Sequence, residues 1–213
     1  AIGPKIDDNL IEIGPGTAAL TEHLIKRCPS MSVLELDRDL VEFLGTKFAE
    51  YPDFKIHSGD ALDVDFTQFY DGRNLRLVGN LPYNISTPLI FKLLENAALI
   101  KDMHFMLQKE VVARICAAPR TKNYGRLSIM LQYHCQVDDL FTVANTAFDP
   151  QPKVESAIIR LKPYVKKPFV AKDETVFAKV VKTAFTHRRK TIANNLSGLL
   201  NTEDFAKLDI DPK

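Results

Sequence analysis

The chain has 213 residues, of which 46% are hydrophobic and 26% charged, and a formal net charge of +1, a composition typical of an ordinary globular protein with one sizeable domain. It contains no apolar run of membrane-spanning length and no signal segment at its N-terminus, so we expect neither a membrane partner nor secretion. Three cysteines without CxxC spacing indicate free thiols in a reducing compartment, and we expect a cytoplasmic protein.

Short apolar runs alternate with helical patterns through the first two-thirds of the chain, which predicts an α/β fold with a parallel sheet and helices on both faces. The helix after the fourth strand is expected to have Thr87 as its N-cap and Pro88 in its first turn. Residues 125–135 fit a helix and a strand equally well. The predicted strands lie within 9–13, 32–36, 54–62, 75–80, 103–108, 140–144 and 154–161, and the helices within 14–27, 37–48, 88–97 and 109–117.

The C-terminal part of the chain is predicted to form a separate helical unit. A Lys- and Pro-rich segment, 162–168, is typical of a linker, and helical patterns follow at 174–185 and 188–200. We expect no helix after these, and we expect that segments flanking the sequence on both sides are missing from it. The predicted organisation is an α/β domain over residues 1–165 and a small helical domain, incomplete at its C-terminus, over residues 166–213.

The stretch EIGPGTAAL reads as the end of a strand, a glycine-rich turn and the start of a helix. Glycines allow a tight turn and a close approach to a ligand, and a helix N-terminus presents free N–H groups. Gly14, Gly16 and Ala19 match the dinucleotide pattern G-x-G-x-x-A. With Glu12 in front, the same glycines match the start of an S-adenosylmethionine loop, in which Ala18 replaces a frequent third glycine. The stretch therefore predicts a cofactor site of one of these two kinds.

Two carboxylates are predicted to complete the cofactor site. Glu35 follows Gly14 by 21 residues at the end of the second strand, where a carboxylate can accept hydrogen bonds from both ribose hydroxyls of an adenosine. Asp60 follows the third strand and could accept from an adenine amino group. Together with Asn80, these residues are predicted to lie at the carboxyl ends of parallel strands, where ligands bind. This chemistry serves NAD and S-adenosylmethionine equally.

The tetrapeptide NLPY follows the fourth strand at the same edge. The exocyclic nitrogen of adenine is a poor nucleophile because its lone pair is delocalised into the ring. The Asn80 side-chain oxygen and the Leu81 carbonyl could both accept from that amine and localise its lone pair, with Pro82 fixing the shape of the backbone. Tyr83 would stack on the base, which is worth about 1–3 kcal/mol. The order of these features predicts methyl transfer to an aromatic amine.

The chain closely resembles the family of small-subunit ribosomal RNA adenine N6,N6-dimethyltransferases, the KsgA type. The resemblance covers nearly the whole chain and implies a Rossmann-like, S-adenosylmethionine-dependent methyltransferase with a small C-terminal helical domain. It implies dimethylation of two adjacent adenosines in the loop of the 3′-terminal hairpin of small-subunit (16S) rRNA, linked to subunit biogenesis. The stretches that carry it are EIGPGTAALTEHL, LELDRDLVEFL, SGDAL, VGNLPYNISTPLIFKLL, DMHFMLQKEVVARI, YGRLSIMLQY, AFDPQPKVESAIIRL and AFTHRRKTIANNL.

The resemblance also implies roles for individual residues. Phe148, in the stretch FDPQPKV, would enclose the target base opposite Tyr83. The implied catalytic residues are Asn80, Leu81, Pro82, Tyr83 and Phe148. The implied cofactor-binding residues are Glu12, Gly14, Gly16, Glu35, Asp60, Ala61 and Asn80. Family members carry an upstream Q-x-F-L segment that contributes to the cofactor site, and this sequence does not contain it.

The helical domain is predicted to contact RNA. Residues 166–213 hold ten basic and six acidic residues, a weak indication of a polyanionic partner. The residues expected to bind rRNA phosphates are Lys179, Lys182, Arg188, Arg189 and Lys190. We expect a monomer that acts on the immature small (30S) subunit. The five histidines show no ligand spacing, so we expect no metal.

Three alternative functions remain open from the sequence. A large-subunit rRNA adenine N6-methyltransferase of the antibiotic-resistance type shares the loop motifs. A ribosome-assembly factor could bind the same RNA with catalysis secondary or lost. An NAD oxidoreductase would use the glycine loop, but it leaves the NLPY loop unexplained and offers no obvious hydride-transfer acid.

Overall fold

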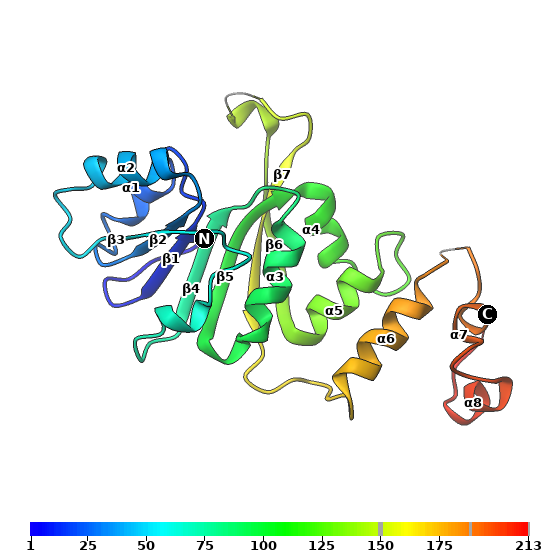
Figure 1. Ribbon diagram of the computed structural model, residues 1–213. Coiled ribbons are helices and arrows are strands. Elements are labelled where there is room, and N and C mark those ends of the chain that lie inside the picture. Colours follow the sequence, from blue (N-terminus) through cyan, green and yellow to red (C-terminus); the bar gives the residue numbers. More distant parts are fainter. Residues whose placement is uncertain (149–150, 188, 213) are drawn as a thin grey trace.

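The computed structural model describes residues 1–148, 151–187 and 189–212. Within these residues one seven-stranded sheet forms the centre of the molecule, in the order β3-β2-β1-β4-β5-β7-β6 (Figure 1). The strands are β1 (Asn9–Ile13), β2 (Ser32–Glu35), β3 (Lys55–Ser58), β4 (Leu75–Asn80), β5 (Ile100–Gln108), β6 (Cys135–Val143) and β7 (Ser156–Pro163). β1 to β5 are parallel, whereas β7 lies antiparallel between β5 and β6. The predicted parallel sheet is confirmed for five strands, and the last pair makes the sheet mixed.

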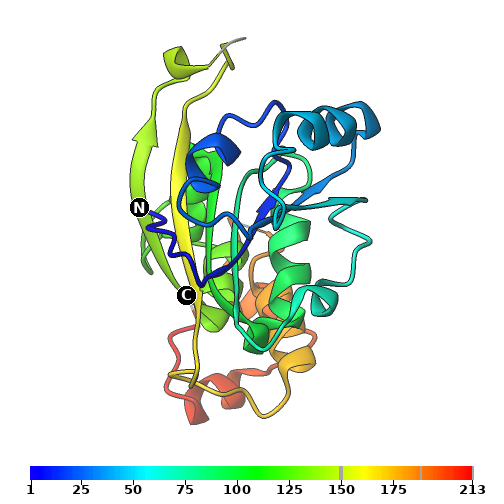
Figure 2. The same ribbon diagram turned by 90° about the vertical axis from the view of Figure 1, so that its left-hand side faces the viewer.

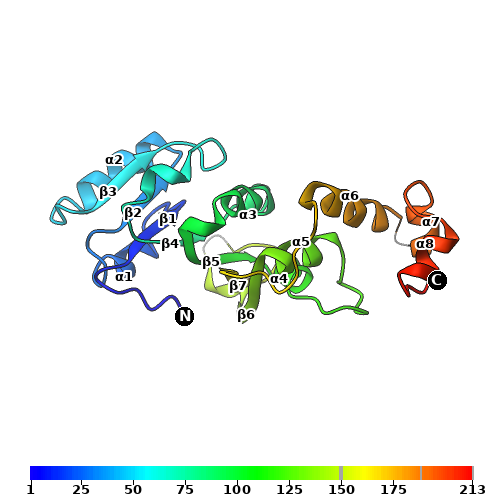
Figure 3. The ribbon, with the colours of Figure 1, turned by 90° about the horizontal axis from the view of Figure 1, so that it is seen from below.

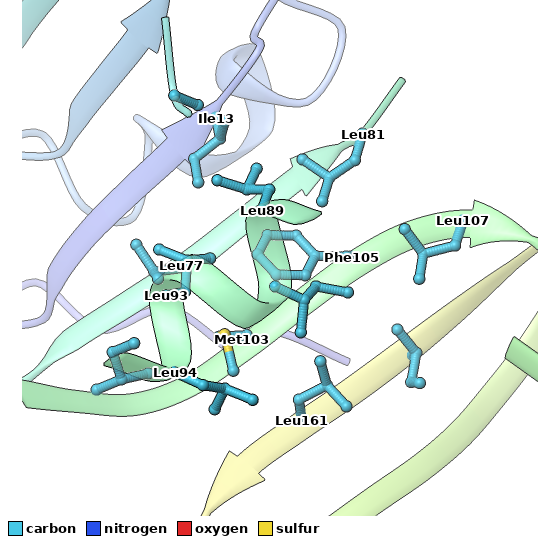
Figure 4. Close-up of a cluster of buried hydrophobic side chains, with 14 of the residues drawn as sticks. Ile13, Leu77, Leu81, Leu89, Leu93, Leu94, Met103, Phe105, Leu107 and Leu161 are labelled. Atoms are coloured by element: carbon cyan, nitrogen blue, oxygen red, sulfur yellow. The ribbon is translucent and has the colours of Figure 1, made fainter. Parts of the chain in front are cut away.

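Helices cover both faces of the sheet, as the alternation predicted. Leu24 of α1 and Leu44 of α2 belong to the hydrophobic core on one face. Leu89 and Leu93 of α3 belong to the core on the other face, where they pack with Phe105 of β5 (Figure 4). The α-helices of the described residues are α1 (Thr21–Leu24), α2 (Arg38–Lys47), α3 (Ser86–Glu95), α4 (Lys109–Ile115), α5 (Arg126–His134), α6 (Glu174–Ala184), α7 (Ile192–Leu196) and α8 (Thr202–Lys207), and the 3₁₀ helices are η1 (Phe66–Phe69), η2 (Ala97–Leu99) and η3 (Asn145–Ala147).

The helix predicted within residues 14–27 forms, but it is shorter than the apolar pattern there, because α1 spans only Thr21–Leu24. Ala18 has a φ of +74°, a left-handed conformation that an α-helix does not contain, so α1 begins only after it. The N–H groups of Arg27 and Cys28 both donate to the Leu24 carbonyl at 2.9 Å and close the helix in a turn. Apolar spacing alone does not reveal these backbone turns.

The start of α3 also differs from the prediction. The residue before the helix is Ile85, not Thr87, and it makes no side-chain cap. The Pro82 carbonyl accepts hydrogen bonds from the N–H groups of Ile85 and Ser86, at 3.2 and 3.1 Å, and so starts the turn earlier. Pro88 lies within the first turn, as predicted.

In the last third of the chain, the structure decides between helix and strand for one segment and contains one helix that was not predicted. Within residues 125–135, Arg126–His134 form α5, and β6 begins at the next residue, Cys135. The expectation of no helix after residue 200 is wrong, because α8 forms there. Asn201 caps α8 by accepting a hydrogen bond from the Asp204 N–H at 3.0 Å, and Asp204 accepts from the Asn201 N–H in return.

The helical part of the chain lies apart from the parallel strands. β7 ends at Pro163 and α6 begins at Glu174, so the boundary predicted after residue 165 falls in the segment between them. Figure 3 shows α6, α7 and α8 beyond α5, at the end of the molecule opposite α2 and β3. The described residues between β6 and β7 project from the edge at which the parallel strands end (Figure 2). No helix within the described ranges has the length and apolar character needed to span a membrane.

Candidate active site

A cavity of about 930 Å³ opens at the carboxyl edge of the parallel strands. Its wall contains Glu12, Gly14 and Gly16 from the β1–α1 segment, Asn80 from the end of β4 and Phe148 from the β6–β7 loop. β1 and β4 are neighbours in the sheet, and the topology therefore brings these distant segments together. Five of the sequence-predicted site residues thus share one cavity.

The glycine-rich turn has the geometry that its sequence predicts. Gly14 and Gly16 have φ values of +68° and +56°, in the left-handed region that favours glycine. The turn is tied to β2, because the Gly14 N–H donates to the Leu34 carbonyl at 2.9 Å. A Cβ added at either glycine would meet no atom within 4 Å, so open space lies beside the backbone there. Ala18 adopts its positive φ at the position where related loops often have a third glycine, which explains that preference.

Glu35 is held by the backbone of two loops. Its carboxylate accepts hydrogen bonds from the N–H groups of Gly16 (3.1 Å), Leu36 (2.9 Å) and Asp37 (3.0 Å), and the residue is 7% exposed. A carboxylate has about four acceptor positions, so about one remains for a ligand hydroxyl. Glu35 does not line the cavity itself, but its bond to Gly16 connects it to the glycine turn.

Asp60 and Ala61 lie after β3, outside the wall of the cavity. One carboxylate oxygen of Asp60 accepts from the Leu62 N–H at 2.8 Å, and the other accepts no hydrogen bond within the described residues. That oxygen is available to an amino group. The Ala61 side chain is packed in the core, so only its backbone can face a cofactor.

Glu12 is a buried carboxyl group, 2% exposed, at the base of the cavity. Burial raises the pKa of Glu12 to about 7, and the nearby Glu35 carboxylate adds to this, although the Thr21 hydroxyl, which donates to Glu12 at 2.7 Å, opposes the shift. The proton of Glu12 is therefore lost near neutral pH.

This pKa predicts a specific dependence of stability on pH. Between the ordinary Glu value of 4.5 and about 7, the unfolded chain ionises Glu12 while the folded chain keeps its proton, so rising pH lowers the free energy of unfolding. The loss approaches about 3 kcal/mol above pH 7. We expect Glu12→Gln to lack this loss, so urea unfolding at pH 5 and pH 8 should show the variant gaining about 3 kcal/mol relative to the wild type. If the difference in free energy of unfolding between the variant and the wild type were the same at pH 5 and pH 8, the raised pKa of Glu12 would be contradicted.

The NLPY loop presents two free acceptors beside the glycine turn. The Asn80 side chain is exposed, and neither its oxygen nor the Leu81 carbonyl accepts a hydrogen bond within the described residues. The Leu81 side chain is 1% exposed and points into the core, so only its backbone is available (Figure 4). The Pro82 carbonyl starts the turn into α3. The arrangement can hold an amine by two oxygens.

Two aromatic residues were predicted to flank the target base. Phe148 lines the cavity and follows η3. Tyr83 is 42% exposed and lies outside the cavity wall, with its hydroxyl 3.5 Å from the hydroxyl of Ser156 on β7. The structure therefore brings Asn80 and Phe148 together in the cavity but does not bring Tyr83 into its wall.

Gly79 is a site residue that the sequence reasoning missed. A Cβ at this position would lie 2.4 Å from the Ile13 carbonyl oxygen, so only glycine allows β4 to approach β1 this closely. The contact sets the distance between the glycine turn and Asn80. A glycine inside a strand is a recognised signal of close backbone approach, and the sequence carried that signal.

Four of the five predicted RNA-binding residues form two exposed groups. Lys179 and Lys182 lie one turn apart on α6, and Arg189 and Lys190 follow that helix. The loop that holds the second pair is fixed by the Asn195 side chain, which donates to the carbonyls of His187 and Lys190. Arg188, the fifth predicted residue, lies outside the described residues.

Comparisons with known proteins show which proteins this chain is similar to. The family described as ribosomal RNA adenine dimethylase matches residues 1–212. The protein named ribosomal RNA small subunit methyltransferase A from Saccharophagus degradans is 60% identical, and the one from Pseudomonas syringae pv. tomato is 55% identical; each alignment covers 99% of this chain and 79% of the relative. A solved dimethyladenosine transferase from Plasmodium falciparum is 27% identical with a TM-score of 0.76, covering 98% of this chain and 73% of that one. The 23S rRNA methyltransferase ErmE shares the fold, with 23% identity and a TM-score of 0.75, covering 99% and 85%.

Proposed function

The chain belongs to the ribosomal RNA adenine dimethylase family and is an S-adenosylmethionine-dependent rRNA adenine dimethyltransferase; from this premise we propose that its targets are two adjacent adenosines in the 3′-terminal hairpin loop of small-subunit rRNA. Relatives named for the small subunit are 53–60% identical over nearly the whole chain. This degree of identity supports the small subunit over the large one, because ErmE shares the fold at only 23% identity.

The cofactor-binding residues of the proposal fit S-adenosylmethionine chemically. Open space beside Gly14 and Gly16 accepts a ligand against the backbone, and Glu35 and Asp60 each keep an acceptor for hydroxyl and amino groups. Glu12 offers a carboxylate to a cationic ligand once it is ionised. When bound, S-adenosylmethionine supplies an activated methyl group on a sulfonium, so the protein needs no strong base and contributes mainly by positioning.

Asn80 and Leu81 are proposed to activate the target amine. Their two oxygens accept from the two N–H groups of N6, which draws the nitrogen toward a tetrahedral shape and localises its lone pair. Pro82 fixes this geometry, because its ring restricts the backbone on both sides. The exposed Asn80 oxygen and the unpaired Leu81 carbonyl support this role.

The target base has to leave its stack to reach the cavity. Phe148 in the cavity wall and the exposed ring of Tyr83 are proposed to stack on it from opposite sides, which is worth about 1–3 kcal/mol per base. Unstacking is easiest for a base in a single-stranded loop, which favours a hairpin loop as the substrate.

The partner proposed for the helical domain is the rRNA of the immature small subunit. Lys179, Lys182, Arg189 and Lys190 are exposed and make no ion pair within the described residues, so they are available to phosphates. Phosphate contacts position the enzyme without reading sequence.

Methyl transfer from labelled S-adenosylmethionine to isolated immature small subunits and to large subunits tests the choice of substrate. We expect label in adenosine of the small-subunit rRNA. Label in the large-subunit rRNA would instead support the antibiotic-resistance type of activity. Binding to small subunits without any label would support an assembly factor.

A further inference from the structure

An apolar row of side chains crosses the sheet next to Asn80. In the strand register, Asn80 of β4 is paired with Met106 of β5, Met106 with Ile158 of β7, and Ile158 with Phe141 of β6. All four residues line the 930 Å³ cavity. Met106 and Ile158 are partly exposed and Phe141 is 52% exposed, so the row is apolar surface and not closed core.

The row points into the cavity because side chains alternate along a strand. Met103, Phe105 and Leu107 of β5 point toward the core under α3 (Figure 4). Met106 therefore points to the opposite face. Its backbone also touches the NLPY loop, since the Met106 carbonyl accepts a hydrogen bond from the Leu81 N–H at 3.3 Å. Adjacent strands lie about 4.8 Å apart, which places the Met106 side chain directly beside that of Asn80.

We propose that Met106, backed by Ile158 and Phe141, receives the methyl group that N6 carries after the first transfer and thereby permits the second. This inference rests on the proposed function. It gives Met106, Ile158 and Phe141, which the sequence pattern predicts only to lie in strands, a role in allowing dimethylation.

The chemistry of two successive transfers creates the need for such a site. In each transfer the N6 lone pair forms a bond to the methyl carbon while the sulfur–carbon bond breaks, its electron pair stays on sulfur to give a thioether, and one N6 proton passes to solvent. Two methyl donors are consumed for each dimethylated base. In the first transfer Asn80 and Leu81 accept from two N–H groups, whereas in the second only one N–H remains.

The first methyl group replaces one of the two N–H hydrogens and so cannot stay against the oxygen that accepted from it. It must occupy apolar space nearby. Methionine suits this task, because its three rotatable bonds and thioether adapt to groups of different size. Met106 is the apolar side chain in register with Asn80 on β5, so it is the neighbour that meets this methyl group.

Met106→Phe tests the proposal by filling that space with a rigid ring. We expect the first methylation to continue while the second slows relative to it by about tenfold or more, so that N6-methyladenosine accumulates. Mass spectrometry of nucleosides from treated small subunits over time gives both rates. Met106→Leu, which conserves volume, should keep the wild-type ratio. Equal slowing of both steps in Met106→Phe, or unchanged dimethylation, would overturn the proposal.

An equilibrium measurement separates this role from general damage. We expect Met106→Phe to weaken binding of a labelled hairpin RNA that contains N6-methyladenosine more than binding of the same hairpin with adenosine, by fluorescence anisotropy without cofactor. An equal effect on both RNAs would count against the proposal. Ile158→Phe places a ring in the same apolar space from β7, and it replaces Met106→Phe in both measurements if that variant fails to fold. If the wild type methylates no adenosine in small subunits, the proposed function fails, while the ratio of the two affinities still decides the role of Met106.

Discussion

Replacing Asn80 with Ala should lower the rate of methyl transfer by about 10²–10³-fold while the affinity for S-adenosylmethionine changes little. The variant loses one of the two acceptors proposed to localise the N6 lone pair, and preorganised polar groups of this kind are worth about that factor. The glycine turn, Glu35 and Asp60 stay in place, because Asn80 makes no side-chain hydrogen bond to them. Single-turnover kinetics with labelled cofactor and calorimetry of cofactor binding measure the two quantities separately.

Asn84→Ala is a matched control for this variant. Asn84 is also exposed and lies in the same loop, but it does not line the cavity. We expect it to keep nearly the full rate. If Asn80→Ala lost rate and cofactor affinity equally, Asn80 would serve the cofactor and not the target amine.

Arg76→Met should lower the free energy of unfolding by about 3–5 kcal/mol, the cost of leaving buried charges unpaired. The Arg76 side chain is 7% exposed and pairs with Asp8 at 2.6 Å and with Asp102 at 2.9 Å. Burial alone would raise the pKa of Asp8, but hydrogen bonds from Arg76, the Lys5 N–H and Lys101 outweigh it and hold the pKa at about 2. Without Arg76, the two carboxylates lose their main partner. Urea unfolding near neutral pH measures the loss.

Arg73→Met provides the comparison for Arg76. Arg73 pairs with Asp71, and both side chains are nearly half exposed, so its loss should cost less than about 1 kcal/mol. If the two variants lost similar amounts of the free energy of unfolding, burial would not be what makes the ion pairs of Arg76 more stabilising than that of Arg73. Arg76 also donates to the carbonyls of Ile2 and Gly3, both of which line the cavity, so its loss should loosen this part of the wall.

The sequence was most informative where strands end. Gly14, Gly16 and Asn80 could be placed at one edge because parallel strands carry their carboxyl ends together, and the structure gathers all three in one cavity. The backbone role expected of Leu81 agrees with the burial of its side chain. Strand direction, by contrast, is not encoded in apolar periodicity, and the antiparallel place of β7 between β5 and β6 could not be predicted.

The positions at which helices begin also could not be predicted from the spacing of apolar residues, because local backbone turns set them. The left-handed Ala18 shortens α1, and the Pro82 carbonyl moves the start of α3 ahead of Thr87. The cap of α8 by Asn201 is carried by side chains, Asn201 and Asp204, and not by apolar spacing. Met106 could not be assigned from sequence, because an apolar residue in an apolar strand gives no sign of the face it occupies.

The most direct test of the central claim is to map methyl groups on small-subunit rRNA, by mass spectrometry of defined fragments, after treatment with the wild type and with Asn80→Ala. The account predicts two methyl groups on N6 of each of two adjacent adenosines in the 3′-terminal hairpin loop with the wild type, and a nearly complete loss of both with the variant. Methyl groups at other positions with the wild type, or undiminished dimethylation by Asn80→Ala, would contradict it.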